Sequence, residues 1–451
     1  MLAGLFRSRK IHASHSLAIL LISILPIPSF ARIPPPAVQT KQKPSNSQTE
    51  AVANSTSPAR NPITHYSLPP DKLRQAYGLY LVNGTLFIFS NVYGWLILWL
   101  CLRRRWTVRA SEWAEKLTNL KILQAAIVAP IFVAILSVLM LPIGLYAQHV
   151  EHEYGISVQR WSSWFRDWCV QLLLVAILSA FLVWILYAFL RRSPRRCWFY
   201  FWLAFIPISA FVVFVEPVAI EPLFNKFEPL QPRHPELVTQ LQRVIARGGV
   251  KIPPSRMFEM KASEKLTGSN AYVTGFGATK RVVVWDTAIG KMSTPQIMFV
   301  FGHELGHYVL GHVIKGFIFV LGVCFVLFYL IHQLAAFMQR KWGTRWGIRG
   351  LDDWASLPLL GLAGSLLFFA AGPLFNAYSR SQEHQADQYG LEIVHGMFPD
   401  SGQVAAQSFQ MLGEEWLEYP DISPLAEFFA WDHPLIRDRV QFALTYNNYS
   451  H

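Results

Sequence analysis

Six long apolar runs constrain the fold of this chain more than any other feature of its sequence. They occupy residues 79–102, 122–146, 170–190, 198–216, 313–336 and 357–376. A helix of about 20 apolar residues crosses the hydrocarbon core of a bilayer, and each run is about that long or longer. Because a helix satisfies its backbone hydrogen bonds internally, it is the form in which such a run crosses a membrane. We therefore expect a mainly α-helical polytopic membrane protein.

The composition agrees with this expectation. Charged residues make up only 15% of the chain, whereas soluble domains contain about 25%. The 16 tryptophans fit the aromatic belts found at membrane interfaces. The net charge of +12 comes from Lys and Arg that cluster in short connections beside the apolar runs, so we expect the lipid bilayer, and no nucleic acid, as a partner. The four cysteines have no CxxC spacing and are interpreted as packing residues.

Basic residues in the connections predict the orientation in the membrane. The connection at 147–169 contains only Arg160 and Arg166. The connections after the first, third and fifth runs are richer, with Arg103, Arg104, Arg105, Arg109, Lys116 and Lys121, then Arg191, Arg192, Arg195 and Arg196, then Arg340, Lys341, Arg345 and Arg349. By the positive-inside rule these three connections are cytoplasmic. The segment after the fourth run is then extracytoplasmic, or periplasmic, and the opposite orientation is the alternative.

The N-terminus has the features of a secretory signal peptide. Arg7, Arg9 and Lys10 precede a short apolar run at 17–27, and Ser29-Phe30-Ala31 resembles a cleavage site. An uncleaved anchor is the alternative. The residues that follow are rich in Pro, Ser, Thr, Gln and Asn, which predicts a disordered tether because little of it can be buried.

Residues 217–312 contain the main soluble segment. The stretch 234–249 predicts an amphipathic helix that Gly248 can end. Three short strands are predicted at 255–260, 270–276 and 280–286. Thr294 and Pro295 predict the N-cap and first position of a helix that carries the sequence HELGH and continues into the fifth span.

The HELGH sequence is a candidate zinc site. His303 and His307 are four residues apart, so both imidazoles project from one face of a helix and can share a metal. Glu304 lies beside them and can take a proton from a water molecule that zinc activates for attack on a peptide carbonyl. HExxH alone is a moderate signal, since a pair of interfacial surface histidines would have the same spacing.

A catalytic zinc site needs a third protein ligand. His312 does not have the spacing of the HExxHxxGxxH pattern and is interpreted as an interfacial or supporting group. Glu383 and Asp387 are four residues apart on a helical face; Glu383 could ligate the metal and Asp387 could accept the spare N–H of a ligand histidine. Two solvated carboxylates are the alternative. Two spans separate His307 from Glu383, so both return to the same side of the membrane.

At this point the sequence resembles a known family, the type I CAAX prenyl endopeptidases, which are membrane zinc metalloproteases of the gluzincin kind. The similar segments are EPVAIEPLFNKFEPL (216–230), SNAYVTGF (269–276), VVVWDTAI (282–289), HELGHYVLGH (303–312), SRSQEHQADQYG (379–390) and DHPLIRDRV (432–440). The resemblance implies a transmembrane helical chamber capped by a small α+β zincin-type catalytic domain. It implies substrates that are peptides near the membrane, including lipid-modified CAAX tails.

The resemblance also implies roles for particular residues. One zinc ion per chain would be bound by His303, His307 and Glu383, with Glu304 as the general base. Other positions of the family motifs imply that Asn270, with Ala271 and Tyr272, holds the substrate backbone and that His433 stabilises the oxyanion. A turn asparagine and a structural histidine are the alternatives for Asn270 and His433. Arg380 and Arg437 are interpreted as buried ion-pair partners.

These interpretations divide the chain into six parts. They are a signal peptide (1–31), a disordered linker (32–75), a four-span membrane region (76–216), a catalytic domain with the HExxH helix (217–312), two further transmembrane helices (313–376), and a C-terminal part of the catalytic domain with the third zinc ligand (377–451).

Two departures from the family limit what the resemblance carries over. Eukaryotic members have seven spans and a site that faces the cytosol, whereas here a signal-like segment replaces the first span and the basic connections place the site on the other side. Membrane or exported proteins are therefore the expected substrates.

A site-two-type intramembrane protease is one alternative function, but Leu351-Asp352-Asp353 lacks the glycine of its ligand motif. A non-catalytic membrane scaffold is another, and the intact HELGH argues against it.

Overall fold

The computed structural model describes residues 62–275 and 280–446, so the predicted signal peptide and most of the predicted linker lie outside the described residues. Within them, six helices are long and apolar enough to cross a membrane, which confirms the six predicted spans. They are α2 (Pro70–Arg103), α4 (Lys121–Glu153), α5 (Trp161–Arg192), α6 with its short extensions η3 and η4 (Cys197–Leu223), α10 (His312–Trp346), and η8 with α11 (Trp354–Val394). The chain is a multi-pass integral membrane protein.

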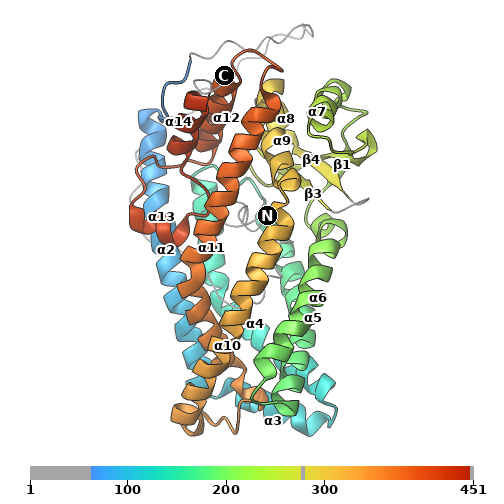
Figure 1. Ribbon diagram of the computed structural model, residues 1–451. Coiled ribbons are helices and arrows are strands. Elements are labelled where there is room, and N and C mark those ends of the chain that lie inside the picture. Colours follow the sequence, from blue (N-terminus) through green and yellow to red (C-terminus); the bar gives the residue numbers. More distant parts are fainter. Residues whose placement is uncertain (1–61, 276–279, 447–451) are drawn as a thin grey trace.

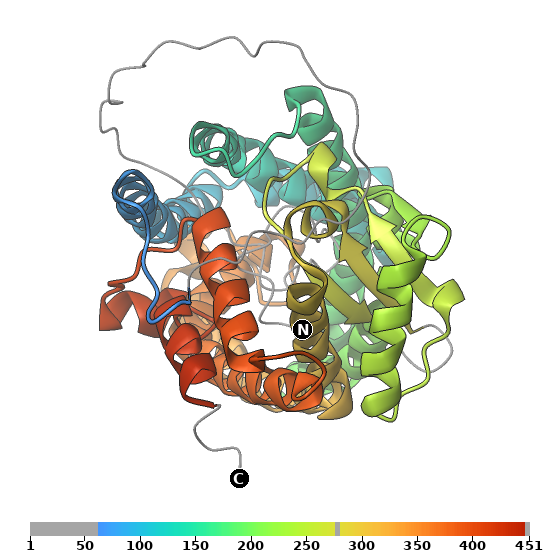
Figure 2. The same ribbon diagram turned by 90° about the horizontal axis from the view of Figure 1, so that it is seen from above.

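The long helices lie side by side, and the small sheet and most of the shorter helices lie at one end of them (Figure 1). Seen from that end, the long helices are arranged roughly in a ring (Figure 2). The short helix α3 (Trp106–Leu117), which follows α2, lies at the opposite end, as do the connections after α5 and α10. All three basic connections therefore share the end of the bundle away from the small sheet.

A four-stranded sheet lies beside the long helices at the other end. Its order is β1-β2-β4-β3, and it contains β1 (Phe227–Pro229), β2 (Met257–Met260), β3 (Ala271–Thr274) and β4 (Arg281–Trp285). β2 and β4 are parallel, and the other two pairs are antiparallel. The three predicted strands are confirmed, while β1 was not predicted because three residues ending in proline show no alternation. β3 is an edge strand among the described strands.

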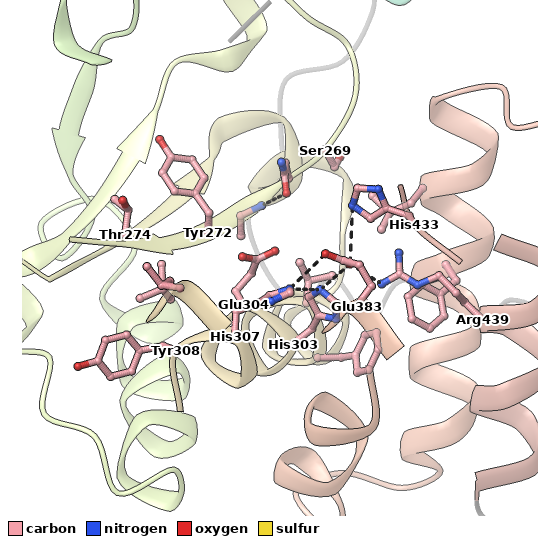
Figure 3. A pocket seen from close by; sticks show the side chains of 18 of the residues that line it. Ser269, Tyr272, Thr274, His303, Glu304, His307, Tyr308, Glu383, His433 and Arg439 are labelled. Carbon is pink, nitrogen blue, oxygen red and sulfur yellow. Dashed lines mark hydrogen bonds and ion pairs between the residues drawn. The ribbon is translucent and has the colours of Figure 1, made fainter. Parts of the chain in front are cut away.

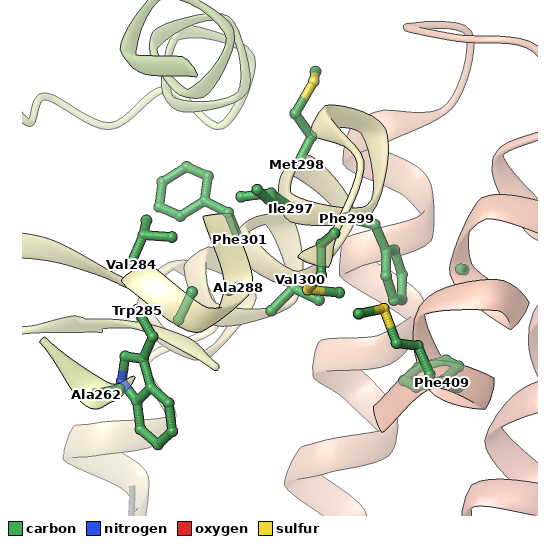
Figure 4. Close-up of a cluster of buried hydrophobic side chains, with 14 of the residues drawn as sticks. Ala262, Val284, Trp285, Ala288, Ile297, Met298, Phe299, Val300, Phe301 and Phe409 are labelled. Carbon is green, nitrogen blue, oxygen red and sulfur yellow. The ribbon is translucent and has the colours of Figure 1, made fainter. Parts of the chain in front are cut away.

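Helix α9 (Thr294–Val309) lies between the sheet and α11 (Leu357–Val394). Phe301 and Trp285 are fully buried on the sheet side (Figure 4). On the other side Phe299 packs edge-on against Phe409 of α12 (Ser401–Glu415), with ring centroids 5.2 Å apart. This helix is therefore held in apolar surroundings from both sides.

Glycines let α9 and α11 approach closely. A Cβ atom on Gly302 would lie 2.8 Å from the Ile393 side chain, and one on Gly390 would lie 3.0 Å from the backbone nitrogen of His303. Real Cβ atoms do not tolerate such contacts without a shift of their neighbours. The sequence HELGH is consequently held against the C-terminal half of α11.

Two expectations about α9 are wrong. Its N-cap is Ser293, whose backbone N–H donates to Gln296 Oε1 at 2.9 Å, and Thr294 is already helical. The helix also does not continue into the fifth span: it ends at Val309, and Gly311 adopts a left-handed backbone conformation (φ 69°) before α10 begins. Glycine takes that conformation without the steric cost that a side chain brings.

Other elements follow the predictions more closely. The predicted amphipathic helix is α7 (Pro235–Arg247), capped by Gly248. α11 is a single helix that contains both the sixth span and the start of the predicted C-terminal part of the catalytic domain. The C-terminal part continues with α12, α13 (Pro424–Ala430) and α14 (Ile436–Tyr446).

Part of the segment predicted as a linker is packed against the rest of the protein. Tyr66 is buried, and its hydroxyl donates to the backbone oxygen of Glu418 at 2.7 Å. The side chain of Gln410 on α12 pairs with both backbone groups of Ser67. Residues 62–69 thus contact α12 before α2 begins at Pro70, earlier than the predicted boundary at residue 76.

Candidate metal centre

His303 and His307 on α9 meet Glu383 on α11. His303 Nε2 lies 3.4 Å from Glu383 Oε2, and His307 Nε2 lies 3.4 Å from Glu383 Oε1. The two Nε2 atoms are 3.2 Å apart. One ligand atom from each residue lies within 4.8 Å of the others, so the three side chains surround a space of the size of a metal ion (Figure 3).

A second layer of polar groups holds these side chains in place. His303 Nδ1 lies 2.8 Å from Asp387 Oδ1. Asp387 is 1% exposed and accepts two hydrogen bonds from Arg439 of α14, at 2.8 and 2.5 Å. On the other side, His307 Nδ1 lies 3.0 Å from His312 Nδ1. In both ligand histidines Nδ1 is engaged and Nε2 is left for a metal, which is the usual arrangement of such ligands.

The donor set fits zinc. Two imidazoles and one carboxylate are the protein ligands of many catalytic zinc sites, whereas calcium and magnesium prefer oxygen donors alone. Burial lowers the pKa of His307 to about 4, so its imidazole is neutral as ligation requires. Burial also lowers the pKa of His303, but hydrogen bonds to Asp387 and Glu383 outweigh that effect and raise it to about 10. Metal binding would therefore displace a proton from His303.

Glu304 points into the cavity that the three residues border (Figure 3). Burial raises the pKa of its carboxyl to about 7. A carboxyl with a pKa near neutrality can both accept and release a proton in the working pH range.

His433 reaches the same site from the loop between α13 and α14. Its Nδ1 lies 2.8 Å from Asp432 Oδ1, and its Nε2 lies 3.7 Å from Glu383 Oε2. Burial lowers the pKa of His433, but the negative charges of Glu383 and Asp432 outweigh this and raise it above its usual value. A protonated imidazole at this position can donate a hydrogen bond into the cavity.

Edge strand β3 forms one wall of the cavity, whose volume is about 200 Å³. Asn270, Ala271 and Tyr272 all line it. The Asn270 side-chain oxygen accepts a hydrogen bond from the Ala271 backbone at 2.8 Å, and its backbone oxygen accepts one from Trp285 at 3.1 Å. The Tyr272 hydroxyl donates to Glu221. The structure thus brings every residue predicted for the site to one cavity, with Asp387 directly behind it.

Arg439 was missed by the sequence reasoning. It shares a helical face with Ile436, Val440 and Ala443, all of which are buried, and this periodicity could have distinguished it from Arg437. The interpretation of Arg437 and Arg380 as buried ion-pair partners is wrong. Arg437 is exposed and lies 3.3 Å from Asp438, whereas Arg380 donates to the backbone oxygens of Glu427 and Trp431.

The aspartates that a site-two-type protease would require lie elsewhere. Asp353 lies in the connection between α10 and α11, beside α3 at the opposite end of the bundle, and it accepts a hydrogen bond from Arg349 Nε at 2.9 Å. The HELGH helix also lies outside the six spans. This arrangement does not favour the intramembrane alternative.

Comparisons with known families match nearly the whole described chain. The family model described as "Peptidase family M48" matches residues 231–447. A second model, described as "CAAX prenyl protease N-terminal, five membrane helices", matches residues 55–226. The described part of that second range contains four of the long membrane-capable helices, together with the shorter α3.

Individual proteins are similar over comparable lengths. "Uncharacterized metalloprotease YhfN" of Bacillus subtilis is 33% identical over 83% of this chain and 86% of that protein. A "CAAX prenyl protease 1 homolog" of Dictyostelium discoideum is 27% identical over 66% of this chain and 68% of that protein. The crystal structure of Ste24p from S. mikatae has a similar fold, with a TM-score of 0.70 and 21% identity over 84% of this chain and 89% of that one.

Proposed function

The chain belongs to the M48 family of membrane zinc metallopeptidases, and from this premise we propose that His303, His307, Glu383 and Glu304 are the catalytic centre of an endopeptidase acting on peptide segments close to the membrane. The observation that carries the proposal is the convergence of the three ligand side chains beside the carboxylate of Glu304. His303, His307 and Glu383 would hold one zinc ion per chain.

A zinc ion held by these residues would supply a Lewis acid that acidifies water and polarises the scissile carbonyl. Glu304 accepts the proton of the attacking water and returns it to the leaving amine, since its raised pKa permits both transfers. His433 donates a hydrogen bond to the carbonyl oxygen as negative charge develops on it. Asp432 orients the His433 ring, and Asp387, held by Arg439, orients the ring of His303.

The peptide substrate lies along β3 in this proposal. An edge strand presents backbone N–H and C=O groups that can pair with an extended chain, and β3 borders the cavity. The Asn270 side-chain amide and the wall formed by Ala271 and Tyr272 would then position the substrate backbone. One end of the cavity adjoins the transmembrane helices through Glu216, Glu221 and Val313, so substrates can include membrane-inserted and lipid-modified chains.

The test of the catalytic assignment is Glu304→Gln in the purified, zinc-loaded protein. We expect zinc content and thermal stability to stay as in the wild type, while peptidase activity falls by about 10³-fold, because only the proton acceptor is lost. Glu236→Gln, an exposed substitution on α7, is the matched control. Undiminished turnover by zinc-loaded Glu304→Gln would exclude the proposed mechanism.

We also propose that the catalytic end faces away from the cytoplasm. The support is that all three basic connections lie at the opposite end of the bundle. The test uses two variants that both lack the four native cysteines. One carries a single cysteine in place of Glu236, and the other carries a single cysteine in place of Thr344. In intact cells an impermeant thiol reagent should label position 236 and spare position 344. The reverse pattern would place the site in the cytoplasm and favour CAAX-type substrates.

A further inference from the structure

The cavity contains a second buried carboxylate that the proposed reaction does not use. Glu216 lies where α6 passes into η3 (Glu216–Ile220), at the membrane end of the cavity, and it is 6% exposed. Its Oε1 atom is fully buried and has no hydrogen-bond partner among residues 62–275 and 280–446. A buried carboxylate without a partner costs several kcal/mol when charged, so such a group in a membrane protein usually serves a function.

The local backbone turns Glu216 toward the cavity. η3 is a π-helical turn in which the backbone N–H of Glu221 donates to the oxygen of Glu216, five residues earlier. This bond replaces the usual i→i+4 pattern and places residues five apart on nearly the same face. Glu216 and Glu221 both line the cavity as a result.

The nearby basic side chain contacts Glu221 and leaves Glu216 without a direct partner in the described part of the chain. Glu221 accepts a hydrogen bond from Arg281 Nη2 at 2.5 Å and another from the Tyr272 hydroxyl. The guanidinium of Arg281 also lies over the ring of Phe227, 4.7 Å from its centroid. The one cation in this cluster is thus engaged by Glu221, and no ion pair links any basic side chain of the described residues to Glu216. Two carboxyl groups in the cavity wall therefore share one guanidinium, and Glu221 is the one that it contacts.

We propose that Glu216 is a specificity-determining residue that binds a basic side chain of the peptide substrate, a lysine or an arginine, near the scissile bond. Tyr272 connects the two features, because it is part of β3 and its hydroxyl contacts the Glu216–Glu221 turn through Glu221. A peptide lying along β3 therefore passes within reach of the Glu216 carboxyl group. An ammonium or guanidinium group there supplies the missing hydrogen-bond donor and, by its positive charge, stabilises the ionised form of Glu216.

The inference rests on the proposed function, since it concerns the same cavity. It is tested with quenched-fluorescent peptides, acetylated and amidated at their ends, in which one lysine is moved through an uncharged sequence. Norleucine, which has a side chain of similar length without the charge, replaces lysine in the paired peptides. For the wild type we expect at least one position where lysine raises kcat/KM about ten-fold over norleucine.

Glu216→Gln should reduce this ratio to about one at the same position, whereas the control Glu236→Gln should keep it. The ratio is taken within one preparation, so a smaller fraction of folded enzyme does not affect it. A wild-type ratio near one at every position, or a ratio that persists in Glu216→Gln, would overturn the inference and indicate that Glu216 is a neutral structural residue.

A binding measurement separates failure of this inference from failure of the proposed function. Fluorescein-labelled peptides of each pair are titrated with the zinc-loaded Glu304→Gln protein, and their Kd values are compared with those for Glu304→Gln/Glu216→Gln. If the wild type hydrolyses none of the peptides, the proposed function fails, yet a lysine preference that depends on Glu216 would still support the inference. Equal Kd ratios in the two proteins would refute it.

Discussion

The two ends of the helix bundle use buried polar groups in opposite ways. At the end with the basic connections, the buried side chains of Asp353, Tyr187 and Ser356 all have partners. Asp353 accepts from Arg349 Nε at 2.9 Å and from the Ala355 backbone at 3.1 Å. The Tyr187 and Ser356 hydroxyls lie 2.7 Å apart inside an apolar cluster.

At the catalytic end, by contrast, groups converge that do not satisfy one another. The Nε2 atoms of His303 and His307 both face Glu383, and Glu304 and Glu216 add carboxylates without partners of their own among the described residues. A network that is complete stabilises the fold, whereas one that lacks a cation or a donor is arranged to receive it from a ligand. The difference predicts how substitutions at the two ends will divide between stability and activity.

The largest effect is expected for Glu383→Ala. Zinc would keep only two protein ligands, so we expect the zinc content after dialysis to fall from about one to near zero per chain and activity to fall by at least about 10³-fold. Zinc per chain is measured by mass spectrometry of the purified protein. Asp353→Ala, at the opposite end, should keep its zinc. Full zinc content in Glu383→Ala would mean that the third ligand is another residue.

A smaller loss is expected for Asp387→Asn. The amide preserves the shape of the side chain but removes the charge that orients His303 and pairs with Arg439. Loss of such a supporting group typically lowers metal affinity about 10- to 100-fold. Competition with a fluorescent zinc chelator gives the affinity, and excess zinc should restore much of the activity. An affinity equal to that of the wild type would remove Asp387 from the site.

Asp353→Asn should lower the stability of the fold and leave activity unchanged, the reverse of Asp387→Asn. The substitution weakens the hydrogen bonds from Arg349 and Ala355, so we expect a loss of about 1–3 kcal/mol in the free energy of unfolding. The unfolding midpoint in detergent should fall, while zinc content and kcat/KM per folded molecule stay unchanged. A changed zinc affinity would show that the two ends are coupled.

The smallest effects are expected at the two left-handed glycines that flank α10. Alanine at Gly311 (φ 69°) or Gly347 (φ 74°) should cost about 1–2 kcal/mol of stability, because a Cβ is disfavoured in that conformation. At Gly347 the new Cβ would also lie 3.3 Å from Arg105, whereas at Gly311 no atom lies within 4 Å.

Zinc affinity distinguishes the two glycine variants. Gly311→Ala should lower it several-fold, since the turn positions His312 against His307, while Gly347→Ala should leave it unchanged. Equal zinc affinities in both variants would show that the break between α9 and α10 does not support the metal site.

Local patterns in the sequence determined much of this protein. Apolar runs of membrane-spanning length predicted all six spans, and the i, i+4 spacing of HELGH predicted a shared face for His303 and His307. The number of spans between His307 and Glu383 placed both at the same end. These inferences succeed because helix length, periodicity and crossing number depend on residues that are close in the sequence or on simple counting.

Tertiary structure decided the rest. Three features depend on how separate helices pack. Asp387 pairs with Arg439 and not with Arg437, His312 contacts His307 across the turn at Gly311, and a π-helical turn places Glu216 beside the cavity. Glycines at 302 and 390 set the distance between α9 and α11, and their effect is visible only once the two helices are side by side. Contacts between residues that are distant in the chain arise from close packing in three dimensions, which no local pattern of one sequence specifies.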